Sequence, residues 1–262
     1  MNRYLKHYWR NRQIVNFKDV TKYEIAYFTE DEKLNMVSQN GLVIQHIDNP
    51  SEEMKLAAVK ESGVAIRHIE NPSEAVQLAA VSQYGSAIKF IENPSEAVQL
   101  AAVNKSSFAI EHIENPTERV QLIAVKKNGN VIQYIKNPSK YIKYYSVKND
   151  SNAIEHLKDS GEYLKYKAVK ENGFMIKHFK KSASEYLKLL AVTNQPYAIE
   201  YIEDPSERLQ LVAIAKNPDT IKYIKNPTEA AQLEAVKQVK YALAKIKNPT
   251  PKVLALQKRL WG

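Results

Sequence analysis

The chain has 262 residues, of which 44% are hydrophobic and none is cysteine, and it carries a formal net charge of +9. The hydrophobic content indicates a folded protein, while the lack of cysteine excludes a disulfide framework and thiolate metal sites. Because no apolar run approaches the ~18 residues that span a bilayer and residues 1–9 lack the apolar segment of a signal peptide, we expect a cytoplasmic protein without membrane contact.

Residues 1–26 precede the regular part of the chain and are predicted to form an N-terminal capping helix region. Tyr8, Trp9 and Ile14 would pack on the first repeat, while the basic side chains of this segment would face water. The alternative is that this basic and aromatic segment grips a partner directly.

Residues 27–247 form a tandem repeat with a period of 22 residues. The segment 71–81, Asn-Pro-Ser-Glu-Ala-Val-Gln-Leu-Ala-Ala-Val, recurs unchanged at 93–103, and looser copies occur at the same spacing. We number each repeat from 1 to 22, starting at the Asn of Asn-Pro; Lys181 is an insertion, and a remnant starts at Asn248. The ten repeats begin at Tyr27, Asn49, Asn71, Asn93, Asn115, Asn137, Asp159, Ser182, Asp204 and Asn226.

Each repeat is predicted to form two short helices. In the repeat at 71, Asn71 suits an N-cap, Pro72 suits the first helical position, and Glu74 completes a capping box. The first helix would run to about position 14, where the Gly at position 15, such as Gly85, would end it with a positive φ. A second helix would cover positions 16–22. Apolar residues at positions 6, 8, 9, 10 and 11, and at 17, 18 and 21, would be buried.

No repeat can bury this apolar surface alone, so the repeats must stack. We therefore predict an all-α fold, an elongated, curved, right-handed α-solenoid of about ten 22-residue two-helix repeats with terminal capping helices. The predicted parts are the capping region 1–26, the repeats 27–247 and a capping helix at 248–262, where Trp261 would seal the last core layer. A leucine-rich repeat is disfavoured because no repeat contains the alternating β-branched run of a strand.

Position 20 carries five of the six histidines. Packed helices lie about 8–10 Å apart, so rings in one row are too far apart to share a zinc ion, whose ligand atoms lie ~2 Å away. We expect no metal, and we interpret these rings as packed on the second helix with a wet polar tip. A ring ladder that contacts a partner is the alternative. The histidines in this row are His46, His68, His112, His156 and His178.

The Glu at position 4 recurs as a catalytic carboxylate would, but helix capping explains it. The sequence contains no phosphate loop, nucleophile elbow, His-Glu-x-x-His motif or dinucleotide fingerprint. We therefore expect a protein that is not an enzyme and that needs no cofactor.

The charge at position 22 changes sign along the chain. It is acidic in the first four repeats, basic at Lys136, Lys158 and Lys180, and mixed afterwards. This row is either a solvated face without a function or a bipartite docking surface whose charges orient a partner.

The repeats over 137–203 depart most from the pattern. Tyr occupies position 5 and Lys position 7 in three successive repeats, and 126–188 contains 14 lysines against 6 acidic residues, a local net charge of +8. Tyr is favoured in protein interfaces, and Lys interleaved with aromatic rings also suits phosphates and bases. The predicted partner-binding residues are Tyr141, Lys143, Tyr145, Lys148, Tyr163, Lys165, Lys167, Lys170, His156, His178, Lys136, Lys158 and Lys180.

The segment Asn-Pro-Ser-Glu-Ala-Val-Gln-Leu-Ala-Ala-Val, with Gly-Ser-Ala-Ile-Lys-Phe-Ile-Glu after it, resembles short α–α repeats of uncharacterised proteins from large bacteriophages and some bacteria. The resemblance covers about 27–262 and implies an interaction scaffold encoded by a phage and acting in the host cytoplasm. Residues 137–203 depart from the consensus, so the resemblance does not extend to what they bind.

We therefore expect a scaffold that binds a protein partner, as a phage-encoded inhibitor or adaptor of a host protein. The alternative is a nucleic-acid-binding solenoid that uses the basic Tyr/Lys face. A third hypothesis, an enzyme such as a helical-repeat DNA glycosylase, needs catalytic side chains that no motif in this sequence indicates.

Overall fold

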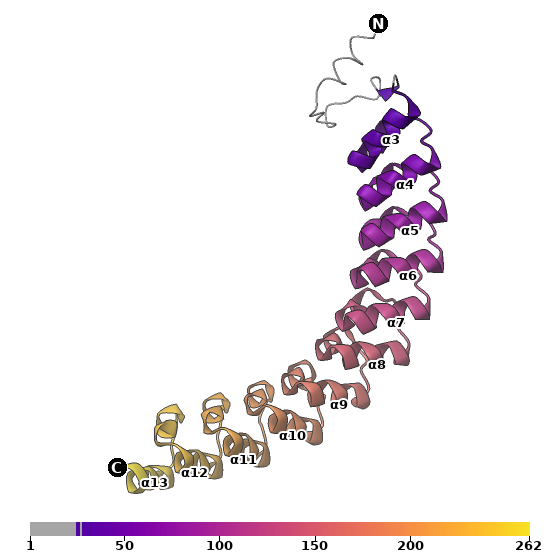
Figure 1. The fold of residues 1–262 in the computed structure, drawn as a ribbon. Helices are drawn as coiled ribbons and strands as arrows, with labels where there is room; N and C mark the ends of the chain where they lie inside the picture. The colour runs from indigo at the N-terminus through magenta and orange to yellow at the C-terminus, as the bar shows by residue number, and fades with distance from the viewer. Residues whose placement is uncertain (1–24, 27) are drawn as a thin grey trace. The chain divides into compact units, whose positions relative to one another are not determined.

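The computed structural model describes residues 25–26 and 28–262. Among them, helices are the only regular secondary structure, and each repeat packs on the next in sequence order (Figure 1). The prediction of an all-α solenoid of about ten two-helix repeats is confirmed. The predicted capping helix at 1–26 lies outside the described residues, apart from Ile25, which is buried, and Ala26.

In the described part of the chain, each repeat contains one α-helix of ten residues followed by a short 3₁₀ helix. Every one of these helices is too short to reach across a lipid bilayer. The α-helices of the ten repeats are α3 (Glu30–Gln39), α4 (Glu52–Glu61), α5 (Glu74–Gln83), α6 (Glu96–Lys105), α7 (Glu118–Lys127), α8 (Lys140–Asn149), α9 (Glu162–Glu171), α10 (Glu185–Asn194), α11 (Glu207–Lys216) and α12 (Glu229–Gln238). The 3₁₀ helices are η2 (Gly41–His46), η3 (Gly63–His68), η4 (Gly85–Phe90), η5 (Ser107–His112), η6 (Gly129–Tyr134), η7 (Ser151–His156), η8 (Gly173–Phe179), η9 (Pro196–Tyr201), η10 (Pro218–Tyr223) and η11 (Lys240–Lys245).

The start of the α-helices differs from the prediction, because the N-cap is the residue at position 3, which is Ser or Thr in most repeats and Gly161 in α9. In α5 the hydroxyl of Ser73 accepts a hydrogen bond from the Val76 N–H at 3.3 Å, and Glu74 is the first helical residue. Asn71 instead adopts a left-handed φ of 45° and turns the chain between repeats, a conformation that Asn tolerates better than most residues. The predicted Asn cap and its capping box with Glu74 are therefore wrong.

The Glu at position 4 connects successive repeats. The Ser95 hydroxyl donates to the Glu74 carboxylate of the preceding repeat at 2.5 Å, and the Thr117 hydroxyl donates to Glu96 at 2.7 Å. The N-cap hydroxyl thus serves its own helix and the neighbouring one.

The Gly at position 15 begins the second helix and does not end the first, and none of the described glycines has a positive φ. Its role is close approach. A Cβ built on Gly63 would lie 2.6 Å from the Ala80 carbonyl oxygen of the next repeat, and one on Gly85 would lie 2.8 Å from that of Ala102. The prediction of a positive-φ stop at Gly85 is therefore wrong, and the second helix begins and ends earlier than the predicted positions 16–22.

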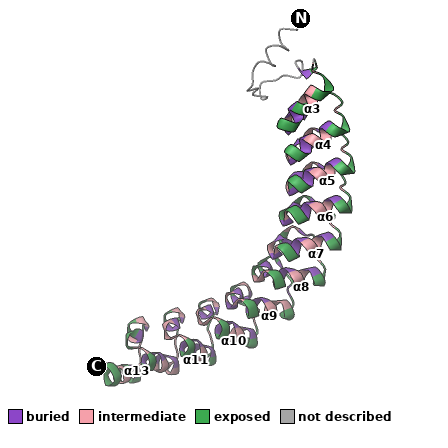
Figure 2. Cartoon of the chain, viewed as in Figure 1, coloured by how far each residue is buried: buried purple, intermediate pink, exposed green. Residues whose placement is uncertain are grey.

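The core lies where each repeat meets its neighbours (Figure 2). Positions 6, 10 and 11 of the α-helix are buried together with 17, 18 and 21, as predicted. Positions 8 and 9, such as Leu78 and Ala79, are only half-buried on the flank of the helix. In the repeat at 71 the buried side chains are Val76, Ala80, Val81, Ala87, Ile88 and Ile91.

The chain separates into two compact units, Met1–Lys127 and Asn128–Gly262. The boundary falls inside the repeat that starts at Asn115, between α7 and η6. In the second unit, the Lys181 insertion is accommodated as a turn in which the N–H groups of Ser182 and Ala183 both donate to the Phe179 carbonyl, at 2.8 and 2.9 Å.

The remnant repeat forms α13 (Pro251–Trp261), which packs on α12. Its buried apolar residue is Val253, whereas the Trp261 side chain remains 37% exposed. The Trp261 indole N–H donates to the Val236 carbonyl at 2.9 Å. Trp261 thus anchors the end of α13 on α12 without forming the sealed core layer that was predicted.

The two glycines of one repeat allow a test of the close approach. Gly173→Ala would bring its Cβ to 2.6 Å from the Ala191 carbonyl oxygen, so we expect a loss of about 1–3 kcal/mol from this overpacking. Gly161→Ser adds its side chain where no atom lies within 4 Å, at the N-cap of α9, so we expect a gain of a few tenths of a kcal/mol. Urea denaturation of the two variants measures both effects, and equal midpoints would contradict the packing role of Gly173.

Candidate functional site

Three exposed tyrosines mark successive α-helices of the second unit. Tyr141 on α8, Tyr163 on α9 and Tyr186 on α10 all occupy position 5, and their exposed fractions are 49%, 58% and 65%. The same position holds Ala75 and Ala97 in the regular repeats of the first unit. These rings therefore form a row on the outer face of the α-helices.

A second set of tyrosines, half-buried at positions 8 and 9, connects this row. The ring of Tyr144 stacks on Tyr163 of the next repeat, with centroids 6.1 Å apart, and edge-on contacts join Tyr145 to Tyr141 and to Tyr144 at 4.7 and 5.2 Å. The ring of Tyr166 stacks in the same way on Tyr186 at 6.4 Å. Such contacts between rings contribute about 0.5–1.5 kcal/mol each beyond area burial, so they fix the ring orientations.

Lysines lie over these rings. The ammonium of Lys148 is 5.7 Å from the Tyr145 centroid, that of Lys167 is 5.8 Å from Tyr163, and that of Lys170 is 5.8 Å from Tyr166. These are cation–π distances. We name this face the Tyr/Lys surface, and it consists of Tyr141, Tyr144, Tyr145, Lys148, Tyr163, Tyr166, Lys167, Lys170 and Tyr186.

The lysines at position 7 have a different setting from the rest of the surface. In regular repeats this position is a Gln that braces the loop, as when the Gln77 side-chain amide donates to the Pro72 carbonyl at 2.9 Å. Lys143 and Lys165 replace it and are half-buried, and Lys165 pairs with Glu162 at 3.1 Å. The Asn-Pro start is lost at Asp159 and at the following repeat, but it is kept at Asn137, in the repeat that contains Lys143.

The structure brings together six of the predicted partner-binding residues, namely Tyr141, Tyr145, Lys148, Tyr163, Lys167 and Lys170, on the Tyr/Lys surface. His156 and His178 lie on η7 and η8, and Lys136, Lys158 and Lys180 lie in the exposed loops or turn at the ends of 3₁₀ helices. They therefore belong to other elements. Tyr144, Tyr166 and Tyr186 also belong to this surface but were not among the predicted residues, although Tyr recurs at their repeat positions 5 and 8.

His178 is a half-buried ring of the position-20 row. Its side chain is 20% exposed, and its Nε2 lies 3.9 Å from a Glu155 carboxylate oxygen, which is too long for a hydrogen bond. Burial lowers the pKa of His178, and the neighbouring Lys177 lowers it further, whereas Glu155 raises it. The ring is therefore largely neutral at pH 7, and the contact with Glu155 is an ion pair only when the ring is protonated.

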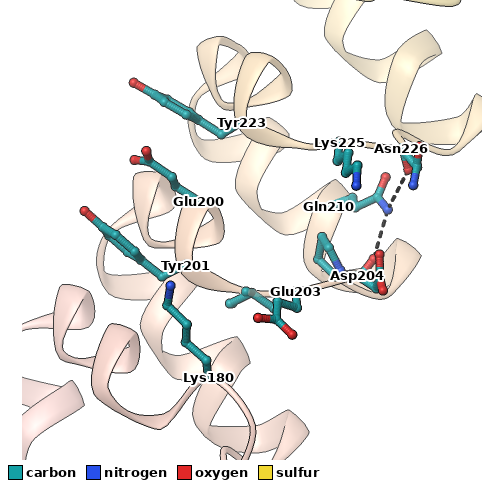
Figure 3. Close-up of a pocket in the computed structure, with 11 residues that line it drawn as sticks. Lys180, Glu200, Tyr201, Glu203, Asp204, Gln210, Tyr223, Lys225 and Asn226 are labelled. Carbon is teal, nitrogen blue, oxygen red and sulfur yellow. Dashed lines mark hydrogen bonds between the residues drawn. The ribbon is translucent and has the colours of Figure 1, made fainter.

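A groove opens between successive repeats on the side of the 3₁₀ helices. Between η9 and η10 it has a volume of about 560 Å³, and Tyr201, Glu200 and Tyr223 lie at one end of it (Figure 3). At the other end the Gln210 side-chain amide donates to the Pro205 carbonyl at 2.9 Å and to that of Asn226 at 3.5 Å. A groove of about 500 Å³ lies at the equivalent repeat positions in 91–115. The groove is therefore a feature of the repeat architecture, and the side chains at each copy determine what that copy can bind.

In the described residues, no three His, Asp or Glu side chains come together as a metal ion requires. Comparison of the chain with protein-family models, with curated proteins and with solved structures gives no match. The side chains themselves must therefore support any functional proposal.

The pKa of His178 is open to direct titration. We expect its imidazole to titrate below about 6.5, the usual value, because burial disfavours the charged ring. The unfolded chain then binds more protons than the folded one between the two pKa values, so this contribution to stability is complete above the unfolded pKa and is lost as the pH falls toward the folded pKa. Glu155→Gln removes the charge that raises the pKa and should move the titration to still lower pH.

NMR of the imidazole resonances measures both shifts, and His178→Gln assigns the signal. An upward shift in Glu155→Gln would show that the 3.9 Å contact does not govern this ring.

Proposed function

We propose that the chain is a non-enzymatic helical-repeat scaffold that binds a protein partner through the Tyr/Lys surface. The observation that carries the proposal is the row of three tyrosines in register, 49–65% exposed, on successive α-helices. The stacking core of the repeat does not need them, because Ala occupies the same position in the repeats at 71 and 93.

The chemistry of the row suits a protein interface. Tyr contributes a large contact area at a low entropic cost and retains a polar tip, which explains its enrichment among residues that dominate binding energy. The contacts with Tyr144 and Tyr166 hold Tyr163 and Tyr186 in place before binding, which reduces the cost of ordering side chains in a complex. The lysines add positive charge, which favours a partner with an acidic surface and accelerates its encounter.

We also propose where the partner comes from, and this part of the proposal is based only on the sequence resemblance. Short repeats of this type in phage proteins support a host protein as the target and a role as inhibitor or adaptor. The Tyr/Lys surface indicates what kind of surface the partner presents, and it does not bear on the organism from which the partner comes.

Removal of the row tests the proposal. We expect Tyr141→Ala, Tyr163→Ala and Tyr186→Ala together to weaken partner binding at least about 30-fold, since aromatic anchors lose about 2 kcal/mol or more when truncated in interfaces. A photo-crosslinking residue in place of Tyr163 first captures the partner from nuclease-treated host lysate, and titration calorimetry with that purified partner then compares the variants.

The matched control changes Arg119→Ala and Arg208→Ala, which are exposed and occupy the same repeat position on α7 and α11. This variant should bind as the unchanged chain does. Retained affinity in the triple tyrosine variant, with unchanged helical circular dichroism, would disprove the assigned surface.

Nucleic acid is the second candidate because three lysine ammonium groups lie over aromatic rings on one face. Interleaved cations and rings are the means by which single strands are bound. If the phosphates bind the lysines, the logarithm of the affinity for a single-stranded oligonucleotide should fall with the logarithm of salt, with a slope of about −0.7 per neutralised phosphate. Fluorescence anisotropy at 50–200 mM salt measures this slope, and a flat response rejects the nucleic-acid function.

A further inference from the structure

On the 3₁₀ helices, position 19 can hold a cation against the ring at position 20. In η4 the ammonium of Lys89 lies 4.9 Å from the Phe90 centroid, and in η10 that of Lys222 lies 4.6 Å from the Tyr223 centroid. The chain itself thus shows that rings in this row accept a cation on their face.

In η9 the corresponding residue is Glu200, an exposed carboxylate beside Tyr201. A carboxylate cannot repeat the contact, because the face of an aromatic ring carries the negative part of the quadrupole. The residue before Tyr201 is therefore a carboxylate, whereas the residue before Phe90 and before Tyr223 is a lysine that contacts the ring.

Glu155 shows where a carboxylate at this repeat position reaches. Its oxygen lies 3.9 Å from Nε2 of His178, the position-20 ring of the next repeat. A glutamate at position 19 can thus lie between its own ring and the following one. Figure 3 shows the same arrangement for Glu200, whose side chain lies between the rings of Tyr201 and Tyr223. There the next ring is a tyrosine, which cannot supply the positive charge that a protonated His178 would.

Each of the two rings that flank Glu200 is contacted by an aromatic residue at position 16 of the preceding repeat. Phe174 contacts Tyr201 edge-on at 6.2 Å, and Tyr197 contacts Tyr223 edge-on at 5.8 Å. The Tyr197 hydroxyl accepts a hydrogen bond from the Asn217 side-chain amide at 3.0 Å. The walls of the groove are therefore fixed in place before any ligand arrives.

We propose that the end of the groove formed by Tyr201, Glu200 and Tyr223 binds an arginine side chain of a partner protein. The planar guanidinium stacks on tyrosine faces and can donate two parallel hydrogen bonds to the Glu200 carboxylate. Packed helices lie about 8–10 Å apart, so a gap between rings on successive repeats takes one flat group at about 3.5–4.0 Å from each face. The site lies on η9 and η10 and goes beyond the Tyr/Lys surface of α8–α10.

The side chains that line this groove carry a slight excess of negative charge. Lys180 and Lys225 line it together with Glu203 and Asp204, so with Glu200 the acidic side chains outnumber the basic ones. The ammonium of Lys222 already lies at the Tyr223 ring. A hydrogen bond with the Tyr223 hydroxyl raises the pKa of Lys222. A cation that enters beside Glu200 therefore meets a carboxylate that lies between two tyrosine side chains.

The test uses Nα-acetyl-arginine amide as the probe and the full chain as the receptor. We expect saturable shifts of the Tyr201 and Tyr223 ring resonances with a dissociation constant on the order of millimolar, as suits one exposed side chain. Glu200→Gln should weaken binding about fivefold, and Tyr223→Ala about threefold. Nα-acetyl-lysine amide should bind more weakly, and the neutral Nα-acetyl-norleucine amide should not bind.

Glu111→Gln is the matched control, because Glu111 is exposed at the same repeat position beside His112 and should leave binding unchanged. Circular dichroism checks that each variant is folded. Equal binding of the arginine and norleucine amides, or unchanged affinity in Glu200→Gln, overturns the site. Equal binding of arginine and lysine amides overturns the stacked guanidinium geometry. Because the readout does not involve the Tyr/Lys surface, it is independent of the outcome for the proposed function.

Discussion

In five of the ten repeats, the next repeat approaches position 15 so closely that the residue there is glycine. At Gly63 the next helix brings the Ala80 carbonyl oxygen so near that no Cβ fits without movement, and the Gly63 N–H donates to the Gln83 side chain at 3.0 Å. Burial then follows, because the small residue at position 10 lets apolar side chains of neighbouring repeats interlock. Since one repeat cannot bury these side chains alone, the stability of the fold depends on the stacking of neighbouring repeats.

Because a fixed set of repeat positions forms the core, the other positions can vary in sequence. Core packing uses positions 6, 10, 11, 17, 18 and 21, so a ring or charge at positions 5, 12, 16 or 19 does not disturb it. The second unit uses this freedom on two faces, with the Tyr/Lys surface on its α-helices and the Glu200 groove on its 3₁₀ helices. Equivalent side chains recur at each step of an array, which suits contact with an extended partner.

The candidate site was predictable in part. Helical spacing placed Tyr141, Tyr145 and Lys148 on one face, and the contact of Lys148 with the Tyr145 ring agrees with that. The stack of Tyr144 on Tyr163 joins two repeats, so its existence depends on how the helices pack. The groove at Glu200 was also missed, because its chemistry comes from a carboxylate of one repeat and a ring of the next. A single repeat contains no sign of that combination.

The sequence by itself determined the period of 22 residues, the pair of helices in each repeat and the apolar positions that form the core, because periodicity and burial are local properties of the pattern. The tertiary structure decided the caps and the glycines. Asn71 and Ser73 are both good N-caps two residues apart, and only the path between repeats assigns the turn to Asn71 and the cap to Ser73. Ser107 and Pro196 occupy the position of Gly85 in other repeats, and this variation already argued against a required positive φ. Where this position is Gly, the lack of room for a Cβ comes from a neighbouring helix, which only the packed array brings into contact.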